Sequence, residues 1–168
     1  MSEIAIRRLS TAILEDFRTI RLEALCRAPD AFGSTYEAEA ARPIEAFEER
    51  LAGSIVFGAY AGERIIGMAG LMRNAGPRES HKAFLWGMYV RAEERRHGVG
   101  AALVAAIIEH APAGVDQITL TVVAENGAAV ALYTRFGFTV YGVEPNALKT
   151  KAGYSSEVLM VKFLRPVM

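Results

Sequence analysis

The chain alternates between strand-like and helix-like periodicity along its whole length, and this alternation restricts its fold more than any other feature. Ile4 and Ile6 mark a first strand. Two helical segments follow, over 10–25 and from Pro43 to about Gly53. Further on, the pattern predicts a hairpin around Gly62 and an apolar strand over 82–90. Helices are predicted over 101–111 and 126–136, and strands over 118–124, 137–142 and 155–164. The order β-α-α-β-β-β-α-β-α-β-β predicts an α/β (α+β) layered fold with a mixed sheet of about seven strands and about four helices.

Length and composition limit the organisation and the partners. With 168 residues the chain is expected to form a single domain over 1–168. Nineteen basic residues balance nineteen acidic ones, which argues against a nucleic-acid partner. No apolar run approaches the roughly 18 residues of a membrane span, and the N-terminus does not resemble a signal peptide. We therefore expect no membrane association.

The cysteine and the histidines exclude some chemistry. Cys26 is the one cysteine, so neither an intramolecular disulfide nor a cysteine metal cage is available, and a cytoplasmic location is expected. Because Cys26 falls on an apolar helical segment, we expect it to be a small buried side chain. His81, His97 and His110 lack a zinc-ligand spacing, and no metal is expected. The sequence also lacks a Walker loop, a G-x-S-x-G elbow and an H-E-x-x-H motif.

One glycine-rich segment between a strand and a helix has the character of an anion cradle. It comprises Arg95, Arg96, His97, Gly98, Val99, Gly100 and Ala101. The first amides of a helix lack intrahelical partners, and the helix dipole adds partial positive charge there. Two glycines allow close approach to a ligand, so a pyrophosphate would bind well. On this segment alone, a simple glycine turn with solvated arginines is an equal alternative.

Arg95, Gly98 and Gly100 match the acyl-CoA signature [Q/R]-x-x-G-x-[G/A]. The further matches are the strand at 85–90, the strand and helix within 118–138, and a Tyr-x-x-x-Gly-Phe pattern at Tyr133, Gly137 and Phe138. On these motifs, the chain resembles the GCN5-related N-acetyltransferase superfamily over nearly its whole length. This resemblance implies a mostly antiparallel central sheet.

The resemblance also implies how a cofactor would bind. The pantetheine arm of acetyl-CoA would pair with backbone groups of Met88, Tyr89 and Val90, beside a bulge in that strand. The amides from Arg96 to Ala101 would receive the pyrophosphate. Acetyl-CoA is thus the implied cosubstrate.

Asn126 and Tyr133 lie seven positions apart, close to two helical turns, and so share one helix face. Asn126 can cap the helix and is expected to reach the cofactor. By the family likeness, Tyr133 is the general acid that protonates the departing CoA thiolate. The alternative is a half-buried core tyrosine with a satisfied hydroxyl.

The acceptor side is less specified. Ribosomal-protein acetyltransferases of this superfamily have a glutamate where Thr121 stands here, so no general base is evident. Glu37 and Glu39 are candidates, although solvated surface carboxylates are the more common case. Loops at 32–36, 73–80 and 147–156 are expected to form the acceptor wall. Its predicted substrate-binding residues are Phe32, Tyr36, Glu37, Trp86 and Tyr154.

These features predict an acetyl-CoA-dependent N-acetyltransferase. It would move an acetyl group to a primary amine of a small molecule or peptide in a ternary complex. Two alternatives stay open: a non-catalytic acyl-CoA-binding sensor, and a transferase with a longer acyl donor. A homodimer is an expectation from the family likeness alone.

Overall fold

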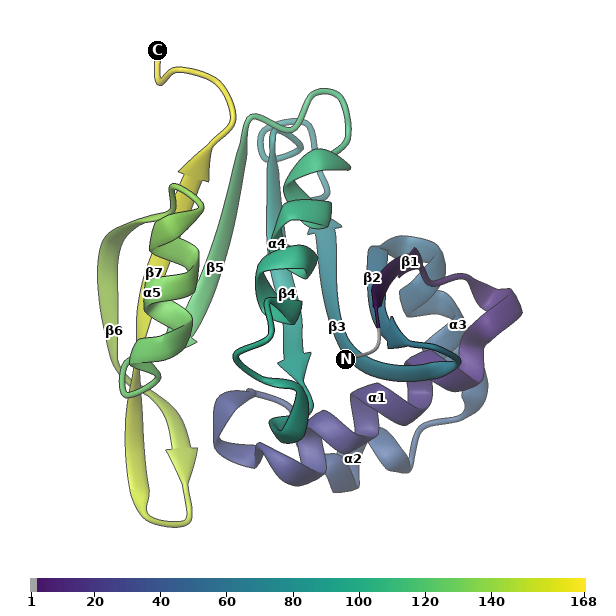
Figure 1. The fold of residues 1–168 in the computed structure, drawn as a ribbon. Coiled ribbons are helices and arrows are strands. Elements are labelled where there is room, and N and C mark those ends of the chain that lie inside the picture. Colours follow the sequence, from purple (N-terminus) through teal and green to yellow (C-terminus); the bar gives the residue numbers. More distant parts are fainter. Residues whose placement is uncertain (1–2) are drawn as a thin grey trace. The chain divides into compact units, whose positions relative to one another are not determined.

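The computed structural model describes residues 3–168, which form seven strands and five α-helices (Figure 1). The elements are β1 (Ile4–Arg8), α1 (Leu14–Arg27), α2 (Tyr36–Ala40), α3 (Ile44–Gly53), β2 (Ile55–Ala61), β3 (Arg64–Arg73), β4 (Lys82–Val90), α4 (Val99–Glu109), β5 (Gln117–Val123), α5 (Gly127–Arg135), β6 (Thr139–Thr150) and β7 (Gly153–Phe163). The predicted order of elements is confirmed. The structure adds one helix, the five-residue α2, which is too short to show a period in the sequence.

The strands are ordered β1-β2-β3-β4-β5-β7-β6. The pairs β1–β2, β2–β3, β5–β7 and β6–β7 are antiparallel, whereas β4 and β5 are parallel. The chain between β4 and β5 contains α4, as a parallel connection requires. The mixed, mostly antiparallel sheet is confirmed.

The chain divides into two compact units. The first comprises Met1–Met72 with Trp86–Ala111, and the second Arg73–Leu85 with Pro112–Met168. Strand β4 contributes its N-terminal part to the second unit and its C-terminal part to the first. A single domain over 1–168 stays a prediction.

In the first unit, β2 is covered on both faces. Val56 and Tyr60 point to one face and join a buried cluster with Phe17 of α1. Phe57 points to the other face, where its ring centroid lies 4.9 Å from that of His110, just after α4. Burial on both sides explains why β2 is an unbroken apolar run in the sequence.

In the second unit, alternate residues of β5 form the buried side of the strand. Ile118, Leu120 and Val122 are buried, whereas Thr121 is exposed. Helix α5 and the residues that follow it contribute further buried side chains, and Phe138 is nearly inaccessible to solvent. These contacts place α5, which carries the predicted acid.

Strand β6 is longer than the sequence indicates. The predicted strand ends at residue 142, and 147–156 is expected to be a loop. In the structure β6 continues to Thr150 and pairs with β7 through the tight turn at Thr150↔Gly153. The register shifts between Glu144 and Leu148, where Asn146 has a φ of 51°. This irregular, polar stretch resembles a turn in the sequence but lies within one hairpin.

Cys26 is exposed, so its predicted burial is wrong. The buried face of α1 passes through Phe17, Ile20 and Ala24, and Cys26 falls outside that stripe. Within residues 3–168, no helix combines the length and apolar character needed to cross a membrane.

Candidate functional site

The N-terminus of α4 has the backbone geometry of an anion cradle. Gly98 is the N-cap in a left-handed conformation with a φ of 79°, and Arg96 has a φ of 68°. Among residues 3–168 no side chain caps this helix. The first helical hydrogen bond runs from the Ala102 amide to the Gly98 carbonyl, at 3.0 Å. The amides that precede Ala102 in the helix are therefore free of intrahelical partners, as an anion site requires.

Three basic side chains lie beside this cradle in the sequence. Arg95, Arg96 and His97 are all exposed. The Arg95 Nε donates to the Val90 carbonyl at 3.0 Å, so this side chain reaches back to β4. The Val90 carbonyl, which is expected to be available for pantetheine, already has this partner.

The C-terminal end of β4 is fixed to α1. Tyr89 is buried, and its hydroxyl donates to the Glu23 carboxylate at 3.1 Å. Arg91 Nε donates to the same Glu23 oxygen at 2.9 Å. Burial, reinforced by Glu23, raises the pKa of Tyr89. Glu23 and Arg91 were missed in the sequence, which shows only that both are charged.

Strand β4 is kinked immediately before the predicted cofactor residues. Gly87 has a φ of 68°, in the left-handed region. Met88 and Val90, which follow it on either side of Tyr89, are only partly buried. This departure from extended backbone occurs within the strand where the family likeness implies a bulge.

Helix α5 begins at the predicted cap. The Asn126 Oδ1 accepts a hydrogen bond from the Ala129 amide at 3.2 Å, which confirms the capping role. Asn126 itself is exposed.

Tyr133 is buried, with 5% of its surface exposed, and its ring packs edge-on to Phe138 at 5.7 Å between centroids. Burial raises the pKa of Tyr133 well above the ordinary value. Within its own unit the hydroxyl has no hydrogen-bond partner. The burial and the contact with Phe138 are also those of a core tyrosine, so the acid role of Tyr133 stays a prediction.

The predicted acceptor residues fall into two groups. Phe32 and Trp86 are partly buried against the core of the first unit. Tyr36 and Glu37 are exposed on α2, and Tyr154 is exposed on β7 in the second unit. In this set, the structure brings together Phe32 and Trp86, because the Arg21 guanidinium lies 5.4 Å from one ring centroid and 5.7 Å from the other.

Glu39 is the centre of a buried ion-pair cluster. Its carboxylate accepts hydrogen bonds from Arg21 Nε and Nη2, at 3.0 and 2.8 Å, and from Arg50 Nη1 at 3.2 Å. Burial raises the pKa of Glu39, but the hydrogen bond and charge of Arg21 outweigh it and hold the pKa at about 2. Glu39 is thus neither a solvated carboxylate nor a suitable general base at neutral pH.

The sequence did carry one unused signal for this cluster. Arg21 stands on the same helical face as Phe17 and Ala24, so its side chain had to enter the core with a partner. Within residues 3–168, no group of three or more His, Cys, Asp or Glu side chains is placed to hold a metal ion.

Comparison with known proteins identifies the family. Residues 16–138 match the acetyltransferase (GNAT) family model. The chain is 30% identical over 148 residues to an L-amino acid N-acetyltransferase of Escherichia coli K12, covering 84% of this chain and 86% of that protein. The chain therefore belongs to the GNAT acetyltransferase family, whose general reaction is acetyl-CoA-dependent N-acetylation.

Solved structures agree on the fold. A GNAT acetyltransferase from Streptococcus pneumoniae aligns with a TM-score of 0.82 at 21% identity, covering 96% of this chain and all of that one. A putative acetyltransferase from Salmonella typhimurium, solved with its cofactor acetyl-CoA, aligns with a TM-score of 0.82 at 18% identity, covering 99% and 97%.

Proposed function

We propose that this protein transfers the acetyl group of acetyl-CoA directly to the primary amine of a small molecule or peptide. Amino acids are included among the acceptors because a relative that matches 84% of the chain is an L-amino acid N-acetyltransferase. The observation that carries the proposal is the uncapped N-terminus of α4, with Arg96 and Gly98 in left-handed conformations.

On this proposal the cradle residues bind the pyrophosphate. The backbone amides at the start of α4 point out of the helix end, where the dipole favours negative charge. A valine or leucine at position 98 would strain the backbone at a φ of 79°. The exposed guanidinium of Arg96 and the His97 ring add charged or polar groups beside the amides. Met88 to Val90 would align the pantetheine arm, with Arg95 releasing the Val90 carbonyl if that group is used.

When bound, acetyl-CoA supplies a thioester whose acetyl carbon is attacked by the amine and whose sulfur leaves as a thiolate. Tyr133 would donate the proton at its Oη to that thiolate, and the resulting phenolate would take up the proton that the acetylated nitrogen must lose, so that the products are an amide and a free thiol. The raised pKa of Tyr133 keeps the phenol proton in place across the neutral range. Burial also makes the phenol a weaker acid, so the transfer requires that the same desolvation raise the pKa of the departing thiol.

The acceptor amine would enter in its neutral form. Among residues 3–168, each carboxyl group with a shifted pKa is shifted downward: Glu39, Glu79 and Glu93. Such groups are poor proton acceptors at neutral pH. The rate of acetylation should then rise with pH as the acceptor's own amine loses its proton. The midpoint of this rise should shift with the amine pKa when acceptors of different pKa are compared.

The test is a panel of amino acids, polyamines, aminoglycosides and short peptides incubated with acetyl-CoA, with release of free thiol followed. We expect at least one amine to accelerate thiol release well above hydrolysis without amine. Repeating the panel with succinyl-CoA distinguishes a longer acyl donor. If CoA binds in a calorimeter but no amine accelerates release, the protein is a CoA-binding module and the proposal is wrong.

A further inference from the structure

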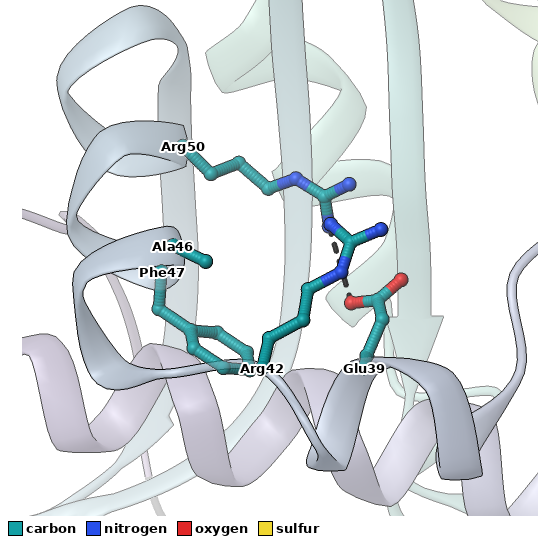
Figure 2. Close-up of a pocket in the computed structure, with 5 residues that line it drawn as sticks. All are labelled: Glu39, Arg42, Ala46, Phe47 and Arg50. Carbon is teal, nitrogen blue, oxygen red and sulfur yellow. Dashed lines mark hydrogen bonds and ion pairs between the residues drawn. The ribbon is translucent and has the colours of Figure 1, made fainter.

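A pocket in the first unit opens between the end of α2 and the first turns of α3 (Figure 2). It is lined by Glu39, Arg42, Ala46, Phe47 and Arg50. Figure 2 shows the side chains of Arg42 and Arg50 both extending toward the Glu39 side of the pocket, whereas Ala46 and Phe47 of α3 supply its apolar part. The pocket therefore combines positive charge with an apolar surface.

Among the residues that line the pocket, positive charge exceeds negative charge. Their one carboxylate, Glu39, is already paired on both oxygens by Arg21, which is itself buried. The other carboxylates of α3, Glu45, Glu48 and Glu49, are exposed and do not line the pocket. Within residues 3–168, Arg50 makes one hydrogen bond, to Glu39, out of the five N–H donors that a guanidinium carries. Arg42 is exposed and adds a third cation. Burial and the neighbouring cations Arg21 and Arg42 lower the pKa of Arg50, against the opposing effect of Glu39.

An excess of guanidinium groups beside a partly buried pocket favours an anion, and the planar fork of arginine matches a carboxylate. Arg50 is well placed to hold one. The Arg50 guanidinium is held by a hydrogen bond to Glu39 and by a cation–π contact with Trp86, whose ring centroid lies 4.9 Å from the guanidinium carbon. Such fixed donors lose little entropy on binding.

The pocket adjoins the predicted acceptor residues. Trp86, which contacts Arg50, immediately precedes the kink at Gly87 in β4. Arg21 lies against both Trp86 and Phe32. All these residues belong to the same unit as the α4 cradle. Arg50 thus links the pocket, through Trp86, to the strand whose next residues, Met88 to Val90, are predicted to align the cofactor.

We propose that Arg42 and Arg50 bind the carboxylate of the acceptor, with the buried Arg21–Glu39 pair holding Arg50 in place. The inference rests on the proposed function and narrows it to amines that carry a carboxylate, free amino acids first. Polyamines and aminoglycosides, which bring further cations, would be repelled.

Binding is tested without turnover. The arginine Nε–H resonances of the 15N-labelled, CoA-loaded protein are recorded during titration with L-leucine, L-phenylalanine, their amides and sodium acetate. We expect the acids to shift the Arg50 resonance and the amides not to, with acetate shifting the same resonance only at about tenfold higher concentration. If acetate binds as well as the acids, the pocket takes a free anion and the acceptor assignment is wrong. If no compound shifts Arg50, there is no anion site.

Kinetics give the second test. In Arg42→Gln and Arg50→Gln, KM for the acid should rise about tenfold or more, while kcat and the KM for the amide stay within about twofold. Arg18→Gln is the matched control, because Arg18 also lies over the Phe47 ring, at 5.7 Å, but does not line the pocket. Equal effects on acid and amide would overturn the inference. Acetylation of the amide alone by the wild-type protein would overturn it too while leaving the proposed function intact.

Discussion

Arg21 and Glu39 form a two-point ion pair, with Nε and Nη2 of the guanidinium 3.0 and 2.8 Å from the two carboxylate oxygens. Both side chains are almost fully buried, with 6% and 2% of their side-chain surfaces exposed. The pair joins α1 to α2, a helix of five residues that could not be stable alone. It therefore orders the segment that carries Glu39, one of the residues that line the pocket of Figure 2.

Glu39→Gln should destabilise the fold strongly, because it leaves the Arg21 charge buried without its counter-ion. We expect a loss of roughly 3–5 kcal/mol in the free energy of unfolding. Urea unfolding followed by circular dichroism measures it. Glu37→Gln is the control on the same helix, where the side chain is exposed and about 0.5 kcal/mol or less is expected. Equal losses in the two variants would contradict the role of the buried pair.

The same carboxylate predicts a pH dependence. The pKa of Glu39 is lowered from 4.5 to about 2 in the folded protein. Its contribution to stability is therefore complete above pH 4.5 and is lost as the pH falls through about 2. Between these values the wild-type protein should lose stability more steeply than Glu39→Gln. Parallel curves of unfolding free energy against pH would show that Glu39 is not responsible.

Tyr133→Phe removes the proposed proton donor and little else. Phenylalanine keeps the edge-on contact with Phe138, and no hydrogen bond within the unit is lost. We expect kcat to fall by about 10²-fold or more, with CoA affinity and thermal stability nearly unchanged. Steady-state kinetics and calorimetry with CoA give the two values. Unchanged turnover would show that Tyr133 is not the acid.

Gly98→Val should abolish CoA binding in a folded protein, because valine cannot easily adopt a φ of 79° and the cradle would distort. Gly62→Val is a matched control. Gly62 has a φ of 62° and, like Gly98, has open space where a β-carbon would lie, but it is in the β2–β3 turn. Both variants should lose similar stability, about 1–3 kcal/mol, and only Gly98→Val should lose CoA affinity by calorimetry. Loss of affinity in both would point to a global effect.

Gly70→Ala should displace the one tryptophan of the chain. A β-carbon at Gly70 would overlap the Trp86 indole ring in the first unit. We expect about 1–3 kcal/mol of destabilisation and a changed tryptophan emission. Gly53→Ala, where a β-carbon would meet nothing within 4 Å, should change neither. An unchanged spectrum in Gly70→Ala would place Trp86 elsewhere.

Local chemistry made much of this molecule predictable. The order of strands and helices follows from periodicity, and the cap at Asn126 follows from its side chain. The two glycines at the start of α4 indicated special backbone geometry, which Gly98 confirms. What the sequence could not show is that the non-glycine Arg96 adopts the same left-handed region.

Features that depend on distant contacts were not predictable. Glu39 follows exposed polar neighbours and looks like a surface residue, yet Arg21, eighteen positions earlier, draws it into the core. Helix α2 is too short to show a period, and β6 passes through a polar stretch around Asn146 that is typical of turns. In each case the partner across the fold, rather than the local residue pattern, determines the structure.

The left-handed backbone of Arg96 makes shape and charge separable in the cradle. A side chain at a φ of 68° is held against its own steric preference, and glycine is the residue that adopts this conformation without cost. Arg96→Gly would thus relax the loop while deleting one guanidinium, leaving every amide in position. The affinity of Arg96→Gly for a diphosphate can then be compared with that of the wild-type protein at several salt concentrations. The affinity that Arg96→Gly retains would measure how much of the binding comes from the main-chain amides.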